Sequence, residues 1–295
     1  MKFEMEDNNY FLKGYDGNAQ HLSVPAFADS FPVTKIGAKA FLSCKSITHL
    51  TLPETVQEIG DWGFAHMKNL KVLTLPAHSL ILGKHVFLDC INLTEIKIEP
   101  DCSMNPGLPY FLASAVTVLN SPSLCCPERA GDALRHGEWM EDYDNILIQF
   151  LSASDQTGFE PVFLGWFSVE DLDSQTQKFV KQRQQEKTAL VFQRLLYPAF
   201  LKDSTRKVLY DYLSSHMPEG SLAHEHTVPF FMLCNEFRDD IRYLKITADT
   251  GYITSQTLPI LQEDLQDAAP EVIGFLLRYQ HELLDTPNFF DNLTL

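Results

Sequence analysis

A repeat of 23 residues, without gaps between residues 36 and 98, is the strongest constraint on how this chain can fold. Six apolar or glycine positions recur in three consecutive copies. They are Ile36, Ile59 and Leu82; Gly37, Gly60 and Gly83; Phe41, Phe64 and Phe87; Ile47, Leu70 and Leu93; Leu50, Leu73 and Ile96; Leu52, Leu75 and Ile98. A period of this length predicts stacked coils that bury a continuous core between them.

Each copy contains one segment that is typical of a strand. Residues 70–75 have leucines at the L-x-x-L-x-L spacing of a leucine-rich repeat, with side chains that alternate in and out. We therefore predict parallel strands near 48–52, 71–75 and 94–98. An array of helical hairpins is disfavoured, because the apolar columns do not recur at 3.6 residues and prolines close the apolar runs.

Two stretches of the repeat carry a resemblance to a known family. Residues 33–41 are Val-Thr-Lys-Ile-Gly-Ala-Lys-Ala-Phe, and residues 52–60 are Leu-Pro-Glu-Thr-Val-Gln-Glu-Ile-Gly. They resemble the BspA-like class of bacterial leucine-rich repeats, and the likeness covers about residues 11–122. The resemblance implies a bacterial origin, a binding role and, in many members, a cell-surface location. The acidic, polar start of this chain is unlike an export signal, so we expect a cytoplasmic protein.

We predict an α+β chain, in which a leucine-rich repeat solenoid of 23-residue repeats precedes an α-helical repeat-like domain. The expected divisions are a solenoid with caps over 1–125, a junction over 126–173 and a helical domain over 174–295. Within the first division, residues 21–25 are typical of a degenerate first coil, and residues 100–122 of a terminal cap.

The second half of the chain has helical periodicity. The expected helices cover 175–197 with Ser174 as the N-cap, a segment that begins at Asp203, then 227–250, 254–265 and 269–284. The last two resemble the helix-turn-helix unit of ankyrin-type repeats. Short turns make neighbouring helices antiparallel, so stacked helical pairs are the best physical expectation.

Charge and hydropathy exclude several classes of partner. The chain has 23 Lys+Arg against 39 Asp+Glu, a net charge of −16, which repels nucleic acid and anionic membrane surfaces. Residues 1–125 hold 9 basic and 12 acidic side chains (−3), and residues 126–295 hold 14 and 27 (−13). No apolar run approaches the ~18–20 residues that a membrane-spanning helix needs.

The outward positions of the predicted strands are the candidate binding residues. They are His49, Thr51, Val72, Thr74, Glu95 and Lys97. This set is small and mixed in chemistry, which favours a protein or peptide as the partner. We predict a non-enzymatic interaction protein that uses this surface and needs no cofactor.

The alternative is an enzyme of unknown reaction, with a site at the junction or in the helical half. Its candidate groups are the loop from His216 to His226, which includes His224 and Glu225, and the acidic pairs Glu141–Asp142 and Asp239–Asp240. None of the standard hydrolase, phosphate-loop, dinucleotide or zinc-protease motifs is present. The spacing of the histidines is not that of a strong metal site, so we expect no metal centre. A third hypothesis gives the solenoid a role in self-association.

The cysteines indicate packing positions rather than cross-links. They are Cys44, Cys90, Cys102, Cys125, Cys126 and Cys234. Cys44 and Cys90 occupy a column in which Met67 is the middle member, so the column needs an apolar side chain of small to medium size. No C-x-x-C motif occurs, and we predict that all six thiols are reduced.

Overall fold

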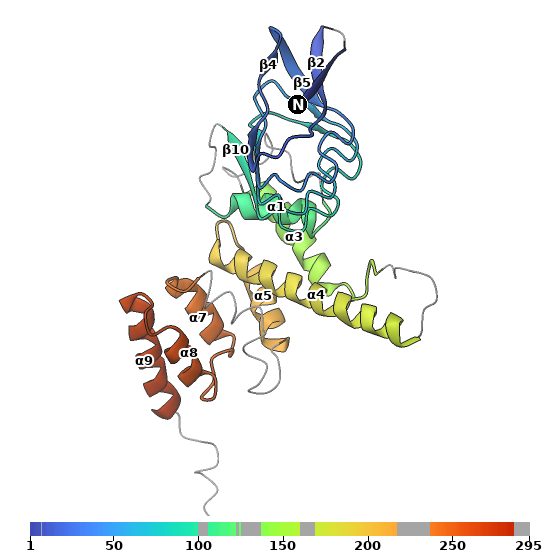
Figure 1. Cartoon of the computed structure of the whole chain (residues 1–295). Helices are drawn as coiled ribbons and strands as arrows, with labels where there is room; N and C mark the ends of the chain where they lie inside the picture. Colours follow the sequence, from blue (N-terminus) through green and yellow to red (C-terminus); the bar gives the residue numbers. More distant parts are fainter. Residues whose placement is uncertain are drawn as a thin grey trace, which may run out of the picture. The chain divides into compact units, whose positions relative to one another are not determined.

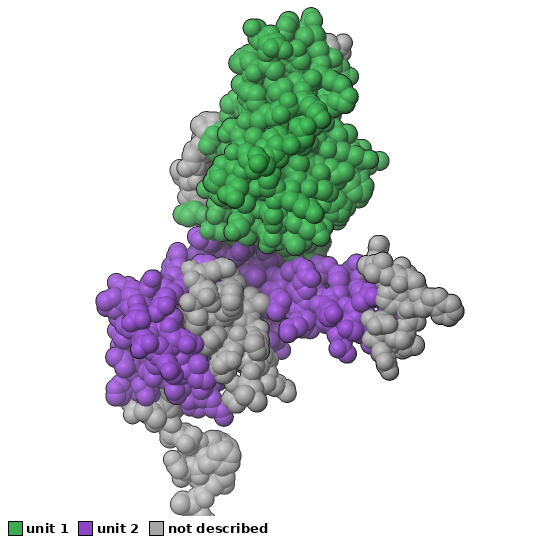
Figure 2. Space-filling model, in the orientation of Figure 1, with its two compact units in different colours: residues 1–150, 199–201 green, residues 151–198, 202–295 purple. Residues whose placement is uncertain are grey.

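The computed structural model describes residues 1–6, 8–99, 106–121, 124, 137–159, 169–216 and 237–285 (Figure 1). These belong to two compact units (Figure 2). The first consists of residues 1–150 with 199–201, and the second of residues 151–198 with 202–295. The division predicted at residue 125 falls outside the described residues.

The first unit contains the predicted ladder of parallel strands. In order across this sheet they are β10 (Glu95–Glu99), β8 (Val72–Pro76), β6 (His49–Thr51) and β3 (His21–Ser23). Leu50 pairs with Leu73, and Leu73 pairs with Ile96, so each 23-residue step of the sequence is one step across the sheet. The predicted strands and their parallel pairing are confirmed.

A second sheet corrects the expectation of one strand per copy. Its path is β1 (Lys2–Glu6), β2 (Asn9–Gly14), β5 (Phe31–Ile36), β7 (Glu58–Ile59) and β9 (Ile81–Leu82), and β4 (Phe27–Ala28) pairs with β5. The repeat is also extended at β5, β7 and β9, and its backbone there forms hydrogen bonds with the preceding coil. The Gln57 amide donates to the Thr34 carbonyl at 2.8 Å, and the Ile81 amide donates to the Gln57 carbonyl at 2.9 Å. Each coil therefore has two strands.

The predicted apolar columns form the core between the two sheets. Phe41, Phe64 and Phe87 stack as a ladder with successive ring centroids 5.8 Å apart. The leucine and isoleucine columns of β6, β8 and β10 are buried. Among the residues of the six columns, Leu82 and Gly83 are half-buried, because β9 is the last strand at its edge of the second sheet.

A helical cap follows the last coil. Helix α1 (Leu108–Thr117) packs against β10, and α3 (Glu138–Ser152) packs on α1 through its first part (Figure 1). The Tyr143 ring lies 5.0 Å from the Phe111 ring, and its hydroxyl is 2.8 Å from that of Ser114. The end of the core beside β10 is thereby covered, as a terminal cap requires.

The second unit is helical, as predicted. Its described helices are α4 (Val169–Leu196), α5 (Asp203–Ser215), α7 (Ile241–Asp249), α8 (Leu258–Asp264) and α9 (Pro270–Asp285). Phe192 of α4 stacks on Tyr243 of α7 with centroids 4.6 Å apart. None of the helices among the described residues is long and apolar enough to cross a membrane.

Three of the predicted helices differ from the structure. Ser174 lies inside α4, which begins at Val169, so it is not an N-cap. Residues 237–240 are not helical, and α7 starts only after Asp240, whose carboxylate accepts the Arg242 amide at 2.9 Å. Residues 227–236 of that prediction lie outside the described residues. The helix expected from residue 254 begins at Leu258.

Candidate functional site

The outward side chains of the four-stranded sheet form two parallel rows. One row is His21, His49, Val72 and Glu95, and the other is Ser23, Thr51, Thr74 and Lys97. Neighbouring members are Cα partners in the sheet, and strands in such a sheet are about 4.8 Å apart. We call these eight residues the strand face. It brings together all six of the residues that the sequence predicts and adds His21 and Ser23.

Hydrogen bonds at the start of the strands hold this register. The Thr48 hydroxyl donates to the Gln20 carbonyl at 3.1 Å, and the Thr94 hydroxyl donates to the Lys71 carbonyl at 3.3 Å. The same two carbonyls accept backbone amides from the next coil, including those of His49 at 3.0 Å and Glu95 at 3.1 Å. The outward side chains are thus carried on a backbone that is bonded at every step.

The exposure of the strand face is uneven. Lys97 is exposed and His49, Thr51, Val72 and Glu95 are half-buried. Thr74 is only 7% exposed, which corrects the expectation that it is an accessible contact residue. It lies between Thr51 and Lys97 in its row.

The charges of the strand face are concentrated on its last strand. Lys97 and Glu95 form an ion pair with an N–O distance of 3.2 Å along β10. At the other end are two histidines, His21 and His49, whose rings stack with centroids 4.1 Å apart and planes 9° apart. Partial burial lowers the pKa of His49, His21 and the lysines Lys97 and Lys71 lower it further, and Glu95 acts in the opposite direction.

His21 is the member of the strand face that the sequence did not identify as a site residue. It pairs with His49, which is 28 residues further along, whereas all later steps are 23 residues. The longer step contains the turn with β4, so the repeat register alone could not align the two histidines. The degenerate first coil at residues 21–25 was the one sequence feature that could have assigned His21 to the site.

The groups of the enzymatic hypothesis do not converge in the described residues. His216 stacks on Tyr212 with centroids 4.1 Å apart, and its Nδ1 is 2.9 Å from the Tyr212 carbonyl oxygen. Asp239 accepts the Ala269 amide at 2.6 Å, and Asp240 caps α7. His224, Glu225 and His226 lie outside the described residues.

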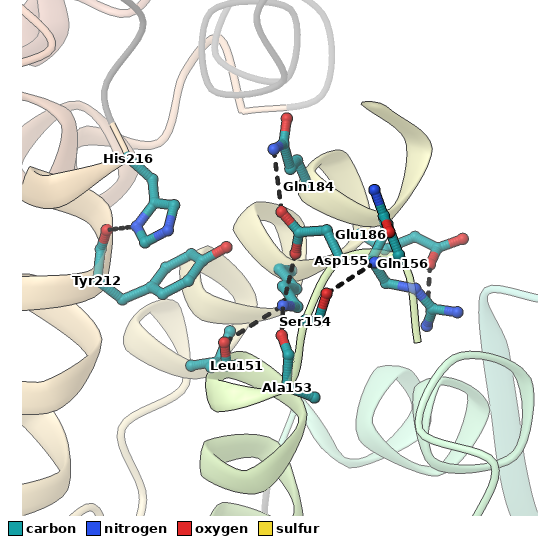
Figure 3. A network of polar contacts seen from close by, with 11 residues as sticks. Leu151, Ala153, Ser154, Asp155, Gln156, Gln184, Glu186, Tyr212 and His216 are labelled. Carbon is teal, nitrogen blue, oxygen red and sulfur yellow. Dashed lines mark hydrogen bonds and ion pairs between the residues drawn. The ribbon is translucent and has the colours of Figure 1, made fainter. Parts of the chain in front are cut away.

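The second unit contains a buried polar network around Lys187, whose partners Leu151, Ala153 and Asp155 are labelled in Figure 3. The Lys187 ammonium donates to the carbonyls of Leu151 at 3.3 Å and Ala153 at 2.6 Å, and to Asp155 Oδ1 at 2.6 Å. Gln184 donates to the second oxygen of Asp155 at 3.0 Å. Burial raises the pKa of Asp155, but the hydrogen bonds of Lys187 and Gln184 outweigh it and lower that pKa overall.

This network has a structural role. Leu151 and Ala153 lie at the end of α3, where backbone carbonyls lack helical partners and a cation is favourable. Lys187 satisfies them from α4 and is itself neutralised by Asp155. In the described part of the chain, no group of three or more His, Cys, Asp or Glu side chains could hold a metal ion.

Comparison with known proteins confirms the family resemblance of the first unit. Residues 18–108 match the model of the BspA type leucine rich repeat region in 6 copies. This segment is therefore similar to the leucine-rich repeat regions of the BspA type. No curated protein matches the chain.

Several solved structures are similar to the repeat segment. A leucine-rich repeat protein of T. pallidum is 25% identical over 32% of this chain and 45% of its own, with a TM-score of 0.31. A leucine-rich cell surface protein of Faecalibacterium prausnitzii is 27% identical over 33% and 28%, with a TM-score of 0.27. A leucine-rich repeat protein of Bacteroides capillosus is 29% identical over 37% and 85%, with a TM-score of 0.30. The chain thus spans less than half the length of the first two.

Proposed function

We propose that this protein is a non-enzymatic interaction protein, which binds a protein or peptide through the strand face. Leucine-rich repeat proteins are generally protein-interaction or surface proteins. The observation that carries the proposal is the register of the four parallel strands, which aligns eight outward side chains in two rows.

The size and chemistry of the strand face fit a polypeptide segment. Four strands about 4.8 Å apart extend over roughly 15 Å, the reach of four or five extended residues. The rows offer hydroxyl groups, an aliphatic side chain, an ion pair and two imidazoles. Such a mixture allows hydrogen bonds and apolar contacts with one chain, whereas a charged polymer would require charge of one sign.

The test compares charge exchanges on the two sheets of the same coils. The variant Glu95→Lys with Lys97→Glu exchanges the ion pair of the strand face and keeps the net charge. The control, Lys35→Glu with Glu58→Lys, exchanges an ion pair of 2.9 Å between β5 and β7 on the other sheet. Both variants should keep the circular dichroism spectrum of the wild type.

Each protein is used to capture partners from a lysate of the source cell, and the captured proteins are identified by mass spectrometry. We expect partners that the wild type and the control retain and the strand-face variant loses. The proposal is wrong if the strand-face variant retains every partner. Loss of partners in the control alone would place recognition on the other sheet.

A further inference from the structure

The stacked histidines lie at the end of the strand face that β3 and β6 form. His21 is exposed and lies on the edge strand, and His49 is half-buried beside it. Their rings are 4.1 Å apart and nearly parallel, at 9°. Two imidazoles at this distance cannot both become cationic without repulsion, so the pair has one readily available charge.

A hydrogen bond determines which nitrogen of His49 can take that charge. The single hydroxyl proton of Thr48 is donated to the Gln20 carbonyl at 3.1 Å. The Thr48 oxygen is also 3.0 Å from His49 Nδ1, so Nδ1 must carry the proton and donate it. This leaves Nε2 with a lone pair. Nε2 has no hydrogen-bond partner among the described residues, and neither ring nitrogen of His21 has one.

The charges around the pair favour an anionic ligand. The groups that act on His49 are His21 from β3, Lys97 and Glu95 from β10, and Lys71 from the segment before β8. Glu95 is engaged by Lys97 in the ion pair of 3.2 Å. Lys71 lies in the next coil, where its amide donates to the carbonyl of Thr48 at 2.8 Å, and it is exposed and forms no ion pair with any described residue. The two imidazoles of the β3–β6 end, which can add a charge, therefore have an uncompensated cation in the adjacent coil.

We propose that His21, His49 and Lys71 form an anion site at this end of the strand face, which binds a carboxylate of an acidic protein segment with uptake of one proton. The proton comes from solvent and is bound at Nε2 of His49 or on the ring of His21, and no other bond forms or breaks. This inference rests on the proposed function and names the chemistry of the partner segment that meets this end.

The pH dependence follows from linkage. In the free protein, partial burial, then His21 and the lysines, keep the pKa of His49 below its ordinary value, so the His49 ring is neutral at pH 7. A bound carboxylate favours the cation and raises that pKa. Affinity should thus be lowest when pH is above the pKa of the complex, and should rise as pH falls toward the pKa of the free protein. A shift of one unit corresponds to a tenfold change in affinity.

The experiment uses the full-length chain and two probe peptides, acetyl-hexaglutamate amide and the uncharged acetyl-hexaglutamine amide. Histidine ring signals are followed by NMR during titration at pH 7.5 and pH 5.5, where glutamate remains ionised. We expect saturable shifts of the His21 and His49 signals with the acidic peptide only, and binding about tenfold tighter at pH 5.5.

The variants His21→Gln, His49→Gln and Lys71→Gln should each weaken binding at pH 5.5, and the histidine variants should remove the pH dependence. The control is His85→Gln, which changes an exposed histidine that stacks on Trp62 elsewhere on the solenoid. His21 lies at an exposed edge, so its variant tests the site even if His49→Gln fails to fold.

The anion site is wrong if affinity for the acidic peptide is equal at the two pH values, if binding is absent, or if the His21 and His49 variants bind as the control does. Equal displacement of the peptide by inorganic phosphate would assign the site to free anions and also overturn the proposal. These outcomes differ from failure of the proposed function. If the anion site fails but the exchange of Glu95 and Lys97 still removes partners in the capture experiment, recognition by the strand face is preserved.

Discussion

Phe41 and Phe64 are 23 residues apart in the sequence, and their ring centroids are 5.8 Å apart in the core. Neither ring is exposed to solvent. The repeat period of the sequence is therefore also the contact period of the core, and a side chain in one coil is packed by its counterparts in the coils before and after it.

Truncation of the middle ring should strongly destabilise the first unit. We expect Phe64→Ala to lower the free energy of unfolding by about 3–5 kcal/mol, since it leaves a cavity between the rings of Phe41 and Phe87. The control is Leu42→Ala, which changes the exposed residue next to Phe41 and should cost about 0.5 kcal/mol. Urea denaturation of both variants provides the measurement. Equal midpoints would contradict the role of the ladder.

Substitution of glycine by alanine should change the stability in opposite directions at one position of the first unit and one of the second. A Cβ at Gly60 would lie 2.7 Å from the backbone nitrogen of Ala38 in the preceding coil, so Gly60→Ala should cost about 1–3 kcal/mol. A Cβ at Gly274, inside α9, would meet nothing within 4 Å, so Gly274→Ala should stabilise the protein by about 0.5–1 kcal/mol. Thermal unfolding of the two variants tests the difference, and a change of the same sign in both would refute it.

Left-handed backbone recurs with the repeat at residues other than glycine. The first column is Lys39, Trp62 and His85, with φ of 59°, 62° and 54°, and the second is Ser43, His66 and Asp89, with φ of 58°, 59° and 58°. A Cβ in this conformation is strained by about 1–2 kcal/mol. These side chains lie on turns between the strands, so their strain belongs to the coil geometry.

Relief of this strain can be measured with two lysines. We expect Lys39→Gly to leave the protein about 1 kcal/mol more stable than Lys45→Gly does, because Lys45 does not have a positive φ. Both lysines are exposed, so the loss of side-chain contacts is similar. Urea denaturation compares them, and a lower stability for the Lys39 variant would contradict the left-handed assignment.

The sequence predicted what the 23-residue period controls and missed what interrupts or supplements it. The Phe41 and Leu50 columns, the strands and the strand face follow from spacing alone. The second sheet was missed because the segment at Glu58–Ile59 is only two residues long and shows no alternation. Thr74 was predicted to be exposed because alternation shows direction, whereas its burial depends on the neighbouring strands. His21 was not assigned to the site because five extra residues precede its partner strand.

In the second unit, the ends of the helices were harder to predict than their presence. Ser174 has the chemistry of an N-cap, but α4 continues through it from Val169. In periodicity, polar residues in the first turn of a helix do not differ from those of a loop. Asp240 is the cap that α7 uses, and it became recognisable only through its bonds to Arg242.

Removal of the ammonium of Lys187 should destabilise the second unit. Lys187→Met keeps most of the volume but leaves Asp155 and two carbonyls at the end of α3 without their donor, so we expect a cost of about 3 kcal/mol. The control, Lys181→Met, changes an exposed lysine of the same helix and should cost less than about 0.5 kcal/mol. Loss of circular dichroism at 222 nm in urea gives both values.

The same pair gives a pH dependence with a defined sign. The pKa of Asp155 is lowered in the folded protein, so its contribution is complete above the unfolded pKa of about 3.9 and is lost as pH falls through the folded value. Stability of the wild type should therefore fall more steeply below pH 4 than that of Lys187→Met. Parallel curves would show that the pair does not couple folding to this carboxyl.

The thiol of Cys90 gives the last prediction. It is buried, it donates to the Phe64 carbonyl at 3.1 Å, and burial raises its pKa to about 11. Cys44 is free and half-buried. We expect native protein to react with a thiol reagent at Cys44 well before Cys90, and denatured, unreduced protein to give six thiols per chain. Four or fewer would refute the prediction that all the cysteines are reduced.

The raised pKa of Cys90 also predicts a pH dependence of stability. A thiol in the unfolded chain ionises near pH 8.5, whereas the buried thiol of Cys90 stays neutral there. The contribution of Cys90 to stability is therefore complete below pH 8.5 and declines above it, by about 1 kcal/mol at pH 9.5. Cys90→Ala should lower stability at every pH through the cavity it leaves, but its decline between pH 8 and pH 9.5 should be shallower than that of the wild type by this amount. An unchanged slope would mean that the thiol is not held neutral by the core.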